Sequence, residues 1–504
     1  MDSNKNKAGL KDRSLSNHFE SIQSTSKTSS RVQTADDNQD HGESNENRIL
    51  LTIFASLVID LLAFTVILPL LPSLLEFYGR QKQDTLYNAM MDRLNYFKTL
   101  MGMPEVERFN GVLFGGILGS LFSFLQFLCC PLFGAASDLY GRKITLLVSM
   151  AGVLLSYVIW AASQNFSLFV VARIIGGLSK GNVTICTAAV TDVTSMKTRS
   201  KGMALVGVAY SIGFIVGPTI GAVFASRSSI ESGNLYYLPA VFASVLILVD
   251  IIFVLCCFKD TLPPEKRVND MTITGNGSSS VLSEVKKAFY YINPVSLFKF
   301  SALERSSISD LKTVRSIGVV YFLFLLFFSG LEFTLTFLTH THFKYTSMKQ
   351  GMMFFFIGII MATVQGGYVR RSAPGSEKKT TIKGIVAIMP GMFLVGIAKT
   401  PFVLYCGLAF VSFGKTINMS RSKLLIIRHR IIYLGTDDQK GKIMGIFRSL
   451  GALARGLGPF VFCSAYWCVG AFWCYLTGAL IFLVPLFLLV KNVPSHKTEK
   501  SNVD

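Results

Sequence analysis

The chain has 504 residues, of which 51% are hydrophobic and only 16% are charged. Soluble proteins carry about 25% charged residues, so this composition excludes an ordinary soluble enzyme and predicts a protein embedded in a membrane. A net charge of +19 is also typical of nucleic-acid-binding proteins. Here, however, the basic residues gather in short segments between apolar runs, which is an orientation signal of membrane proteins, and no nucleic-acid partner is expected.

Residues 1–48 are polar and predict a disordered cytosolic tail. Twelve apolar runs follow, in two blocks of six, and each membrane span needs about 20 apolar residues. We expect one six-helix bundle over residues 49–258, a cytosolic inter-bundle loop over 259–315, a second bundle over 316–490 and a cytosolic tail over 491–504. The expected spans are Ile49–Leu71, Val112–Ala136, Ile144–Ala162, Phe166–Val190, Met203–Ala225, Tyr237–Phe258, Ile317–Phe337, Gly351–Val369, Ile382–Ala398, Pro401–Phe413, Ile443–Val469 and Gly470–Val490.

Loop charge predicts the orientation of these spans. The loops on one side are rich in Lys and Arg, whereas the loops on the other side are short or mixed in charge. Since basic loops stay in the cytosol, both termini are expected there, in the plasma membrane or an internal membrane. The basic loop residues are Arg142, Lys143, Lys197, Arg199, Lys201, Arg370, Arg371, Lys378, Lys379, Lys440 and Lys442.

The first outer loop, Ser73 to Gly111, contains an apolar stripe at helical spacing. A helix on the membrane surface and a lid packed on the helix bundle both explain this stripe, and the sequence leaves the two open. The stripe consists of Leu86, Met90, Leu94, Phe97 and Met101.

The two halves of the chain repeat one another. Span five contains Gly207, Gly213 and Gly217-Pro218, and span eleven contains Gly445, Gly451 and Gly458-Pro459 in a similar arrangement. Internal repeats of this kind are typical of transporters in which two bundles move about a central site. The predicted fold is therefore an all-α membrane protein with twelve transmembrane helices in two pseudo-symmetric six-helix bundles.

The loop after span two provides the first family motif. The run from Gly134 to Lys143, with Asp138, Gly141 and Arg142, resembles the signature loop of the major facilitator superfamily. The arginine that usually follows the aspartate is Leu139 here. An acid at a helix end can pair with a base in one state and release it in another, so this loop predicts a gate. Asp192 and Arg199 are expected to join this gate.

Three further motifs resemble the drug/proton antiporters of the same superfamily. Gly207, Gly213 and Gly217-Pro218 match the antiporter motif of span five, where glycine lets helices approach closely. Arg173 followed by Gly176-Gly177 matches the motif of span four, and Asp60 lies in a pattern similar to that of span one. The chain looks most similar to the tetracycline-transporter-like branch of animals. The resemblance implies the major facilitator fold.

Placing an ionisable residue inside a span has a high free-energy cost, so such residues predict a substrate or proton pathway. We expect Asp60 or Glu332 to carry the proton, and Arg173 to hold that acid ionised in one state and to meet an anionic substrate in the other. Gln126 and Gln365 are expected to supply neutral hydrogen bonds. Arg173 and Lys180 lie seven residues apart, hence on one helix face, and Arg448 and Arg455 repeat this spacing.

Two of these ionisable groups have alternative interpretations. Arg448 either joins the pathway with Arg455 or extends to the cytosolic edge of the membrane. Asp250 is expected to form a structural pair. The intramembrane groups comprise four bases and three acids, a surplus of one positive charge that favours organic anions.

Span ten departs from the pattern. After Pro401–Phe413 the chain has Lys415 and then five further basic residues, which cannot lie in hydrocarbon. This predicts an irregular tenth helix, from a splicing or gene-prediction error around residues 414–433 or from a cytosolic basic helix that touches anionic lipid. The five residues are Arg421, Lys423, Arg428, His429 and Arg430.

Together these features predict a secondary active transporter that moves amphipathic drugs or organic anions, tetracycline-like compounds among them, by alternating access with proton antiport. An uncoupled metabolite facilitator and a transporter-derived scaffold or sensor are the alternatives. We expect no enzyme, no cofactor and no metal site, and a chain that works as a monomer in the bilayer with protons and a small organic anion or drug as partners. The nine cysteines are expected to be packing residues.

Overall fold

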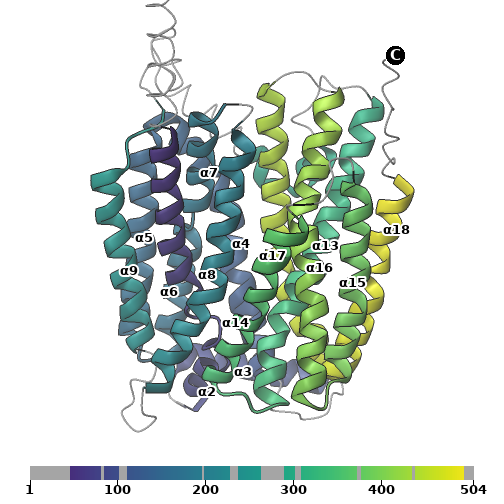
Figure 1. Ribbon diagram of the computed structural model, residues 1–504. Helices are drawn as coiled ribbons and strands as arrows, with labels where there is room; N and C mark the ends of the chain where they lie inside the picture. The colour runs from purple at the N-terminus through teal and green to yellow at the C-terminus, as the bar shows by residue number, and fades with distance from the viewer. Residues whose placement is uncertain are drawn as a thin grey trace, which may run out of the picture.

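A computed structural model of the protein shows long helices running side by side in two groups, the earlier part of the chain in one and the later part in the other (Figure 1). The predicted tails and inter-bundle loop lie largely outside the residues that the structure describes. The structure describes residues 46–80, 84–101, 110–195, 198–227, 237–262, 289–300, 308–369, 371, 376–433 and 437–492.

The amino-terminal half begins with the Glu46–Thr65 helix, so the first span ends before Leu71, where the sequence placed its end. The chain then turns and continues as two further helices, the first of which packs its buried face against the core of this half. The remaining elements of this half are α2 (Leu71–Arg80), α3 (Thr85–Met101), α4 (Asn110–Tyr140), α5 (Arg142–Ala162), α6 (Phe166–Ser179), α7 (Asn182–Val193), α8 (Arg199–Arg227) and α9 (Tyr237–Cys257).

The carboxyl-terminal half starts with a short helix and then repeats the same up-and-down order. Its elements are α12 (Pro294–Lys299), α13 (Ile308–Thr341), α14 (Ser347–Val364), the π-helical turn η5 (Gln365–Val369), α15 (Glu377–Ile397), α16 (Pro401–Tyr433), α17 (Asp437–Ile481) and α18 (Leu483–Asn492).

Ten stretches of the described chain are long and apolar enough to cross a membrane. One of them, Gly445–Asn492, turns back at Gly470, whose φ of 80° is a backbone conformation that suits glycine. It therefore contributes two spans. α16 is not among these ten stretches but packs along α15 in the same half. The all-helical membrane fold is confirmed.

We call the end of the molecule where Glu46 begins the first helix and Asn492 ends the last one the terminal end, and the other end the opposite end. The loops with Arg142 and Lys143 lie at the terminal end, as does the start of α8. In Figure 1 the terminal end is at the top, and α2 and α3 lie at the bottom.

Span ten is a regular helix, and the expectation of an irregular tenth helix is wrong for the described backbone. α16 continues without a break from Pro401 to Tyr433, so the basic residues extend a long helix instead of ending a short one. It packs along α15, where Gly384 and Gly414 bring the two backbones together. Lys415, the first of its basic residues, has a partner inside the bundle, described below.

The stripe in the first outer loop divides between the bundle and the surface: Leu94 is buried and Met90 packs against the core, which favours a lid, whereas Leu86 is exposed. Leu94 of α3 is buried, and the Tyr87 ring packs edge-on against the rings of Phe114 and Phe166, with centroids 5.2 and 5.4 Å away. Asp84 joins the lid to the bundle, since its carboxylate accepts hydrogen bonds from the backbone of α3 and from Ser167 of α6.

The glycines of span five divide between two neighbours. Gly213 and Gly217 face the Glu46–Thr65 helix, and a Cβ atom at Gly217 would lie only 1.9 Å from Thr65 Oγ1. Gly207 faces the other half, with Gln365 Nε2 at 3.6 Å from its would-be Cβ. Pro218 lies inside the continuous helix α8.

The cysteines divide into three groups. Cys186, Cys463 and Cys474 are buried, as expected of packing residues. Others are half-buried, and the expectation is wrong for a third group that is exposed on the helix surfaces. The exposed thiols are Cys256, Cys257 and Cys468.

Candidate functional site

Span four is interrupted at mid-membrane. α6 ends at Ser179, and Lys180 follows with φ −79° and ψ 67° before the chain continues as α7. The Ser149 hydroxyl of α5 stabilises this break, because it donates to the Ser179 carbonyl at 2.6 Å and accepts from the Gly181 N–H at 3.1 Å. Because of the break, Arg173 and Lys180 do not share one continuous helix face. Interrupted helices commonly form binding sites in transporters, since they free backbone groups inside the membrane.

The break positions Lys180 beside Asp60, the acid of span one. Lys180 Nζ lies 2.7 Å from Asp60 Oδ1, and Asn182 Nδ2 donates to the same oxygen at 3.0 Å. Both charged side chains are sealed from solvent, with 4% and 1% of their surface exposed. Asp60 Oδ2 has no hydrogen-bond partner among the described residues. A charge pair this dry persists because each group neutralises the other.

Arg173 has a different role from the one expected. Its guanidinium stacks over the Phe122 ring, 4.2 Å from the ring centroid, and the ion pair expected of it is formed by Lys180. A cation over an aromatic face is attracted by the ring quadrupole without being neutralised by it. Among the described residues Arg173 therefore forms no ion pair, in contrast to Lys180.

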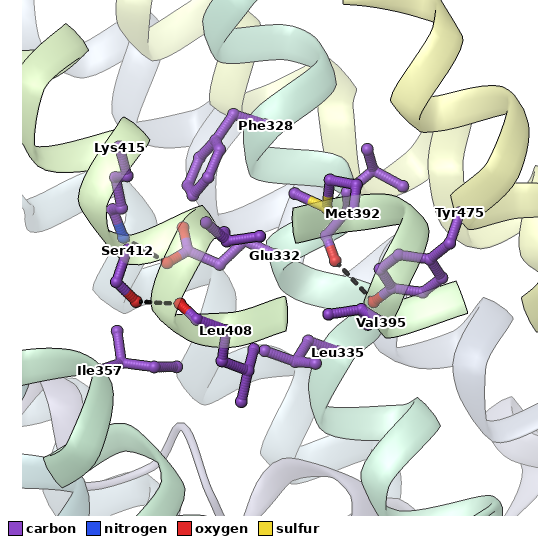
Figure 2. Close-up of a pocket in the computed structure, with 12 residues that line it drawn as sticks. Phe328, Glu332, Leu335, Ile357, Met392, Val395, Leu408, Ser412, Lys415 and Tyr475 are labelled. Atoms are coloured by element: carbon purple, nitrogen blue, oxygen red, sulfur yellow. Dashed lines mark hydrogen bonds and ion pairs between the residues drawn. The ribbon is translucent and has the colours of Figure 1, made fainter. Parts of the chain in front are cut away.

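The carboxyl-terminal half holds a second ion pair. Glu332 of α13 and Lys415 of α16 point toward one another and pair through Oε1 and Nζ (Figure 2). The two side chains are 33% and 14% exposed, so this pair is much more open than the one in the amino-terminal half. Lys415 also lies 5.8 Å from the ring of Phe214, which belongs to the amino-terminal half.

A small cavity adjoins the second pair. Its volume is about 20 Å³, enough for roughly one water molecule. Glu332, Lys415 and Ser412 line one side of it, and the Tyr475 ring lines the other (Figure 2). Apolar side chains such as Leu335 and Met392 form most of the remaining wall, so a charge here meets little competition from water.

The two ion pairs occupy equivalent places in the repeat. In each half the first span supplies an acid and the fourth span supplies a lysine: Asp60 with Lys180, and Glu332 with Lys415. Sequence reasoning missed Lys415 because it treated the charges of span ten as a defect. The internal repeat was the available signal. Spans seven and ten correspond to spans one and four, so an acid and a base in spans one and four predict the same pair in spans seven and ten.

Two arginines of α17 face the seam between the halves. Arg448 Nη1 donates to the Thr184 carbonyl of α7 at 3.4 Å, so it crosses the seam instead of extending to the membrane edge. Arg455, two turns further along, lies in mid-span and is nevertheless exposed. Among the described residues neither arginine forms an ion pair with an acid.

The residues expected to form a gate come together at the terminal end. Arg142 pairs with Asp192 at 2.8 Å and with Asp138 at 2.5 Å, and its backbone N–H donates to Asp260 at 3.0 Å. Gly141, with φ 96°, turns the chain into α5 so that Arg142 can enter the cluster. Arg199 is peripheral to this cluster: its Nη2 donates to the Thr191 carbonyl at 3.4 Å.

The neutral residues of the expected pathway lie apart. Gln126 is half-buried on α4, and Gln365 begins the π-helical turn η5, with its amide directed toward Gly207. Neither glutamine joins an ion pair. At the opposite end, His340 Nε2 of α13 lies 3.1 Å from Glu76 Oε2 of α2, a contact between the two halves. Burial raises the pKa of Glu76, but hydrogen bonds from Arg80 and His340 outweigh it and lower the pKa below its usual value.

Sequence and structure comparisons agree with this architecture. The Major Facilitator Superfamily model matches residues 53–459. The chain belongs to the major facilitator superfamily. As a member of this superfamily it is a multi-pass membrane transporter and not an enzyme, and the predicted fold and family are confirmed.

Individual members of the superfamily are similar over most of their length. "Major facilitator superfamily domain-containing protein 10" of Bos taurus is 43% identical over 460 residues, covering 90% of this chain and 95% of the relative. The class H tetracycline resistance protein of Pasteurella multocida is 24% identical over 445 residues, covering 87% and 95%. The crystal structure of the human organic anion transporter MFSD10 (TETRAN) superposes with a TM-score of 0.72 at 42% identity, covering 88% of this chain and 99% of that one. The tetracycline-transporter-like resemblance is thus confirmed.

Proposed function

We propose that the protein is a proton-coupled secondary transporter of organic anions. The observation that carries this proposal is the uncompensated positive charge at the seam. Asp60 and Glu332 are each neutralised by a lysine, whereas Arg448 and Arg455 have no acidic partner among the described residues. A site with two guanidinium groups that no acid among the described residues neutralises favours a ligand with negative charge, because arginine pairs well with carboxylates. The relation to the human organic anion transporter supports the same substrate class.

Glu332 is the residue that best suits proton coupling. It is a third exposed and lines a cavity, so protons can reach it, while Asp60 is sealed. When Glu332 takes up a proton, its ion pair with Lys415 is lost and Lys415 becomes a free cation. Lys415 also touches Phe214 across the seam, so releasing it changes the contact between the two halves. This links the protonation of Glu332 to the conformation of the transporter.

This geometry also bears on the direction of coupling. A proton on Glu332 frees a lysine, which adds positive charge and favours anion binding, so proton and anion bind best together. Coupling between two ligands is reciprocal, and the pair therefore favours transport of both in the same direction. Antiport, which the resemblance to tetracycline exporters implies, requires the opposite linkage. The direction of the pH gradient that drives uptake distinguishes the two.

The orientation rests on loop charge. Arg142, Lys143 and Lys201 lie at the terminal end, and basic loops face the cytosol. We infer that both termini are cytosolic and that the lid α3 faces outward. Labelling of an added terminal tag in intact and permeabilised cells tests this inference. A tag accessible without permeabilisation would invert the assignment.

Uptake of a fluorescent organic anion into proteoliposomes tests the transport function. We expect accumulation that depends on a pH gradient. The double variant Arg448→Ala, Arg455→Ala should lose most uptake, while Arg315→Ala, a half-buried arginine of α13 whose Nε donates to the Lys299 carbonyl, is the matched control. Glu332→Gln should remove the dependence on the pH gradient while leaving exchange of labelled for unlabelled anion.

Each other outcome would indicate a different function for this protein. Uptake that ignores the pH gradient in the unmodified protein would indicate an uncoupled facilitator. Folded protein that moves no organic anion would contradict the substrate class and leave a different substrate or a scaffold role.

A further inference from the structure

A buried acid outside both ion pairs has no partner. Asp250 of α9 is 0% exposed, and neither carboxylate oxygen has a hydrogen-bond partner among the described residues. The structural pair expected for it from the sequence is not formed there. An ionised carboxylate in such surroundings costs several kcal/mol, so the group is retained more readily with a proton bound.

The groups around Asp250 compensate a negative charge only in part. Ser56 and Asp60 face it from the Glu46–Thr65 helix, and Lys180 and Cys186 face it from the interrupted fourth span. Lys180 is already paired with Asp60, and Asp60 adds repulsion. Asp250 thus has a second acid, not a free base, as its charged neighbour.

A column of polar side chains leads away from this acid pair. Thr52, Ser56 and Asp60 recur at every fourth position of one helix, so they share one face. All three are buried, with 8%, 4% and 1% of their surface exposed. The Thr52 hydroxyl donates to the Arg48 carbonyl at 2.9 Å, an arrangement common for hydroxyls in membrane helices.

The column ends at a second cavity near the terminal end. This cavity has a volume of about 10 Å³, close to that of one water molecule, and Thr52 lines it together with Arg48 and Lys259. Cys257 also lines it and lies seven residues from Asp250 on α9, hence on the same helix face. The cavity and Asp250 therefore lie along one seam, between the Glu46–Thr65 helix and α9.

This seam is separate from the one between the two halves. The outer face of α9 is exposed at Leu248, Ile252 and Leu255, as expected of a helix that faces lipid. Arg448 and Arg455 belong to α17 of the carboxyl-terminal half, and Arg448 contacts α7 across the seam between the halves.

We propose that Thr52, Ser56 and Asp250 form a proton path from the terminal end to Asp60, along the seam between the first and sixth spans and outside the substrate cavity. Asp250, which holds a proton at rest, takes up a new one from water in the second cavity as it passes its own proton to Asp60. On Asp60 it breaks the ion pair, leaving Lys180 as a free ammonium; the reverse steps return the proton to water. Successive positions are about 6 Å apart along the axis, so water or side-chain rotation completes each transfer. The path adds a second proton site, in the amino-terminal half, to the proposed coupling at Glu332, and it can be tested without any substrate.

The first experiment is infrared spectroscopy of the full-length protein in detergent at neutral pH. We expect the carbonyl stretch of a protonated carboxylic acid, and its loss in Asp250→Asn. Asp92→Asn, a change at an exposed acid of α3, is the matched control and should leave the band unchanged. A spectrum of Asp250→Asn identical to that of the unmodified protein would overturn the protonated assignment.

The second experiment measures proton uptake after an acid jump, with a pH-sensitive dye and no substrate. Asp60→Asn identifies the part of the signal that belongs to Asp60. Ser56→Ala and Thr52→Val should slow that part on the order of 100-fold, the size typical of a lost proton-transfer group. Thr381→Val is the control, because Thr381 is also buried and also donates to the carbonyl four residues before it. Unchanged rates in both path variants would overturn the path, whether or not organic anions are substrates.

Discussion

The two ion pairs of this transporter have the same composition and the same place in the repeat, yet their surroundings differ. Asp60 and Lys180 are sealed and share a third partner, Asn182, whereas Glu332 and Lys415 open onto a cavity. The difference begins in the fourth span of each half. Span four is interrupted at Lys180 and turns that lysine inward, while span ten runs through Lys415 as one continuous helix. A buried pair contributes mainly to structure unless a proton can reach it, and an open pair can respond to its surroundings.

The largest expected effect tests this contrast directly. Lys180→Ala leaves Asp60 buried and uncompensated, and removing one partner of a buried pair costs about 3–5 kcal/mol. Lys415→Ala leaves an acid that water can reach, and its cost should be on the order of 1 kcal/mol. Chemical or thermal unfolding of both variants in detergent measures the two costs. Equal losses of unfolding free energy in the two variants would contradict the view that the two ion pairs differ in burial.

The glycines of span five provide a second test of this comparison, because Gly213 and Gly217 pack against the helix that carries Asp60. Gly217→Ala places a methyl group where Thr65 Oγ1 lies 1.9 Å away, and overpacking of this kind costs about 1–3 kcal/mol. At Gly207 the nearest atom is 3.6 Å away, so Gly207→Ala should be nearly neutral. Unfolding temperatures of the two variants check this. A destabilised Gly207→Ala would mean that the seam between the halves is tighter than described.

A smaller effect is expected at the break in span four. Ser149→Ala removes the hydroxyl that bonds Ser179 and Gly181, at a cost of about 1–2 kcal/mol. Ser412→Ala is the counterpart in the other half, where the hydroxyl bonds only the Leu408 carbonyl of its own continuous helix. We expect the first variant to expose the backbone around Lys180 to hydrogen exchange and the second to leave α16 protected. Equal protection in both variants would show that the interruption needs no support.

The smallest effect concerns the lid of the amino-terminal half. Burial raises the pKa of Asp84, but hydrogen bonds from Ser167 and Tyr87 outweigh it and lower the pKa below its usual value. A carboxyl whose folded-state pKa is depressed stabilises the fold above its unfolded pKa, and this contribution is lost as pH falls through the folded value. Asp84→Asn should therefore lower the unfolding temperature by a few degrees at neutral pH and by less in acid. A loss that does not depend on pH would contradict the assignment.

Patterns along the chain determined much of this protein. Apolar run lengths gave the spans, and the loop from Gly134 to Lys143 gave the family, because both depend on local composition. The gate residues Asp138, Arg142 and Asp192 could also be predicted, since they lie at the ends of neighbouring spans. Asp60 and Glu332 were recognisable because charge inside a span always requires a reason.

Only the tertiary structure decided which of these charges meet. Lys180 takes the role expected of Arg173 because the chain breaks after Ser179, and no spacing rule reveals a break that depends on the Ser149 hydroxyl of another helix. Lys415 was misjudged for the same reason: its charge is unfavourable in lipid, and only the position of Glu332 on a different helix makes it favourable. Sequence specifies the cost of a buried charge, whereas the partner that offsets this cost comes from elsewhere in the chain.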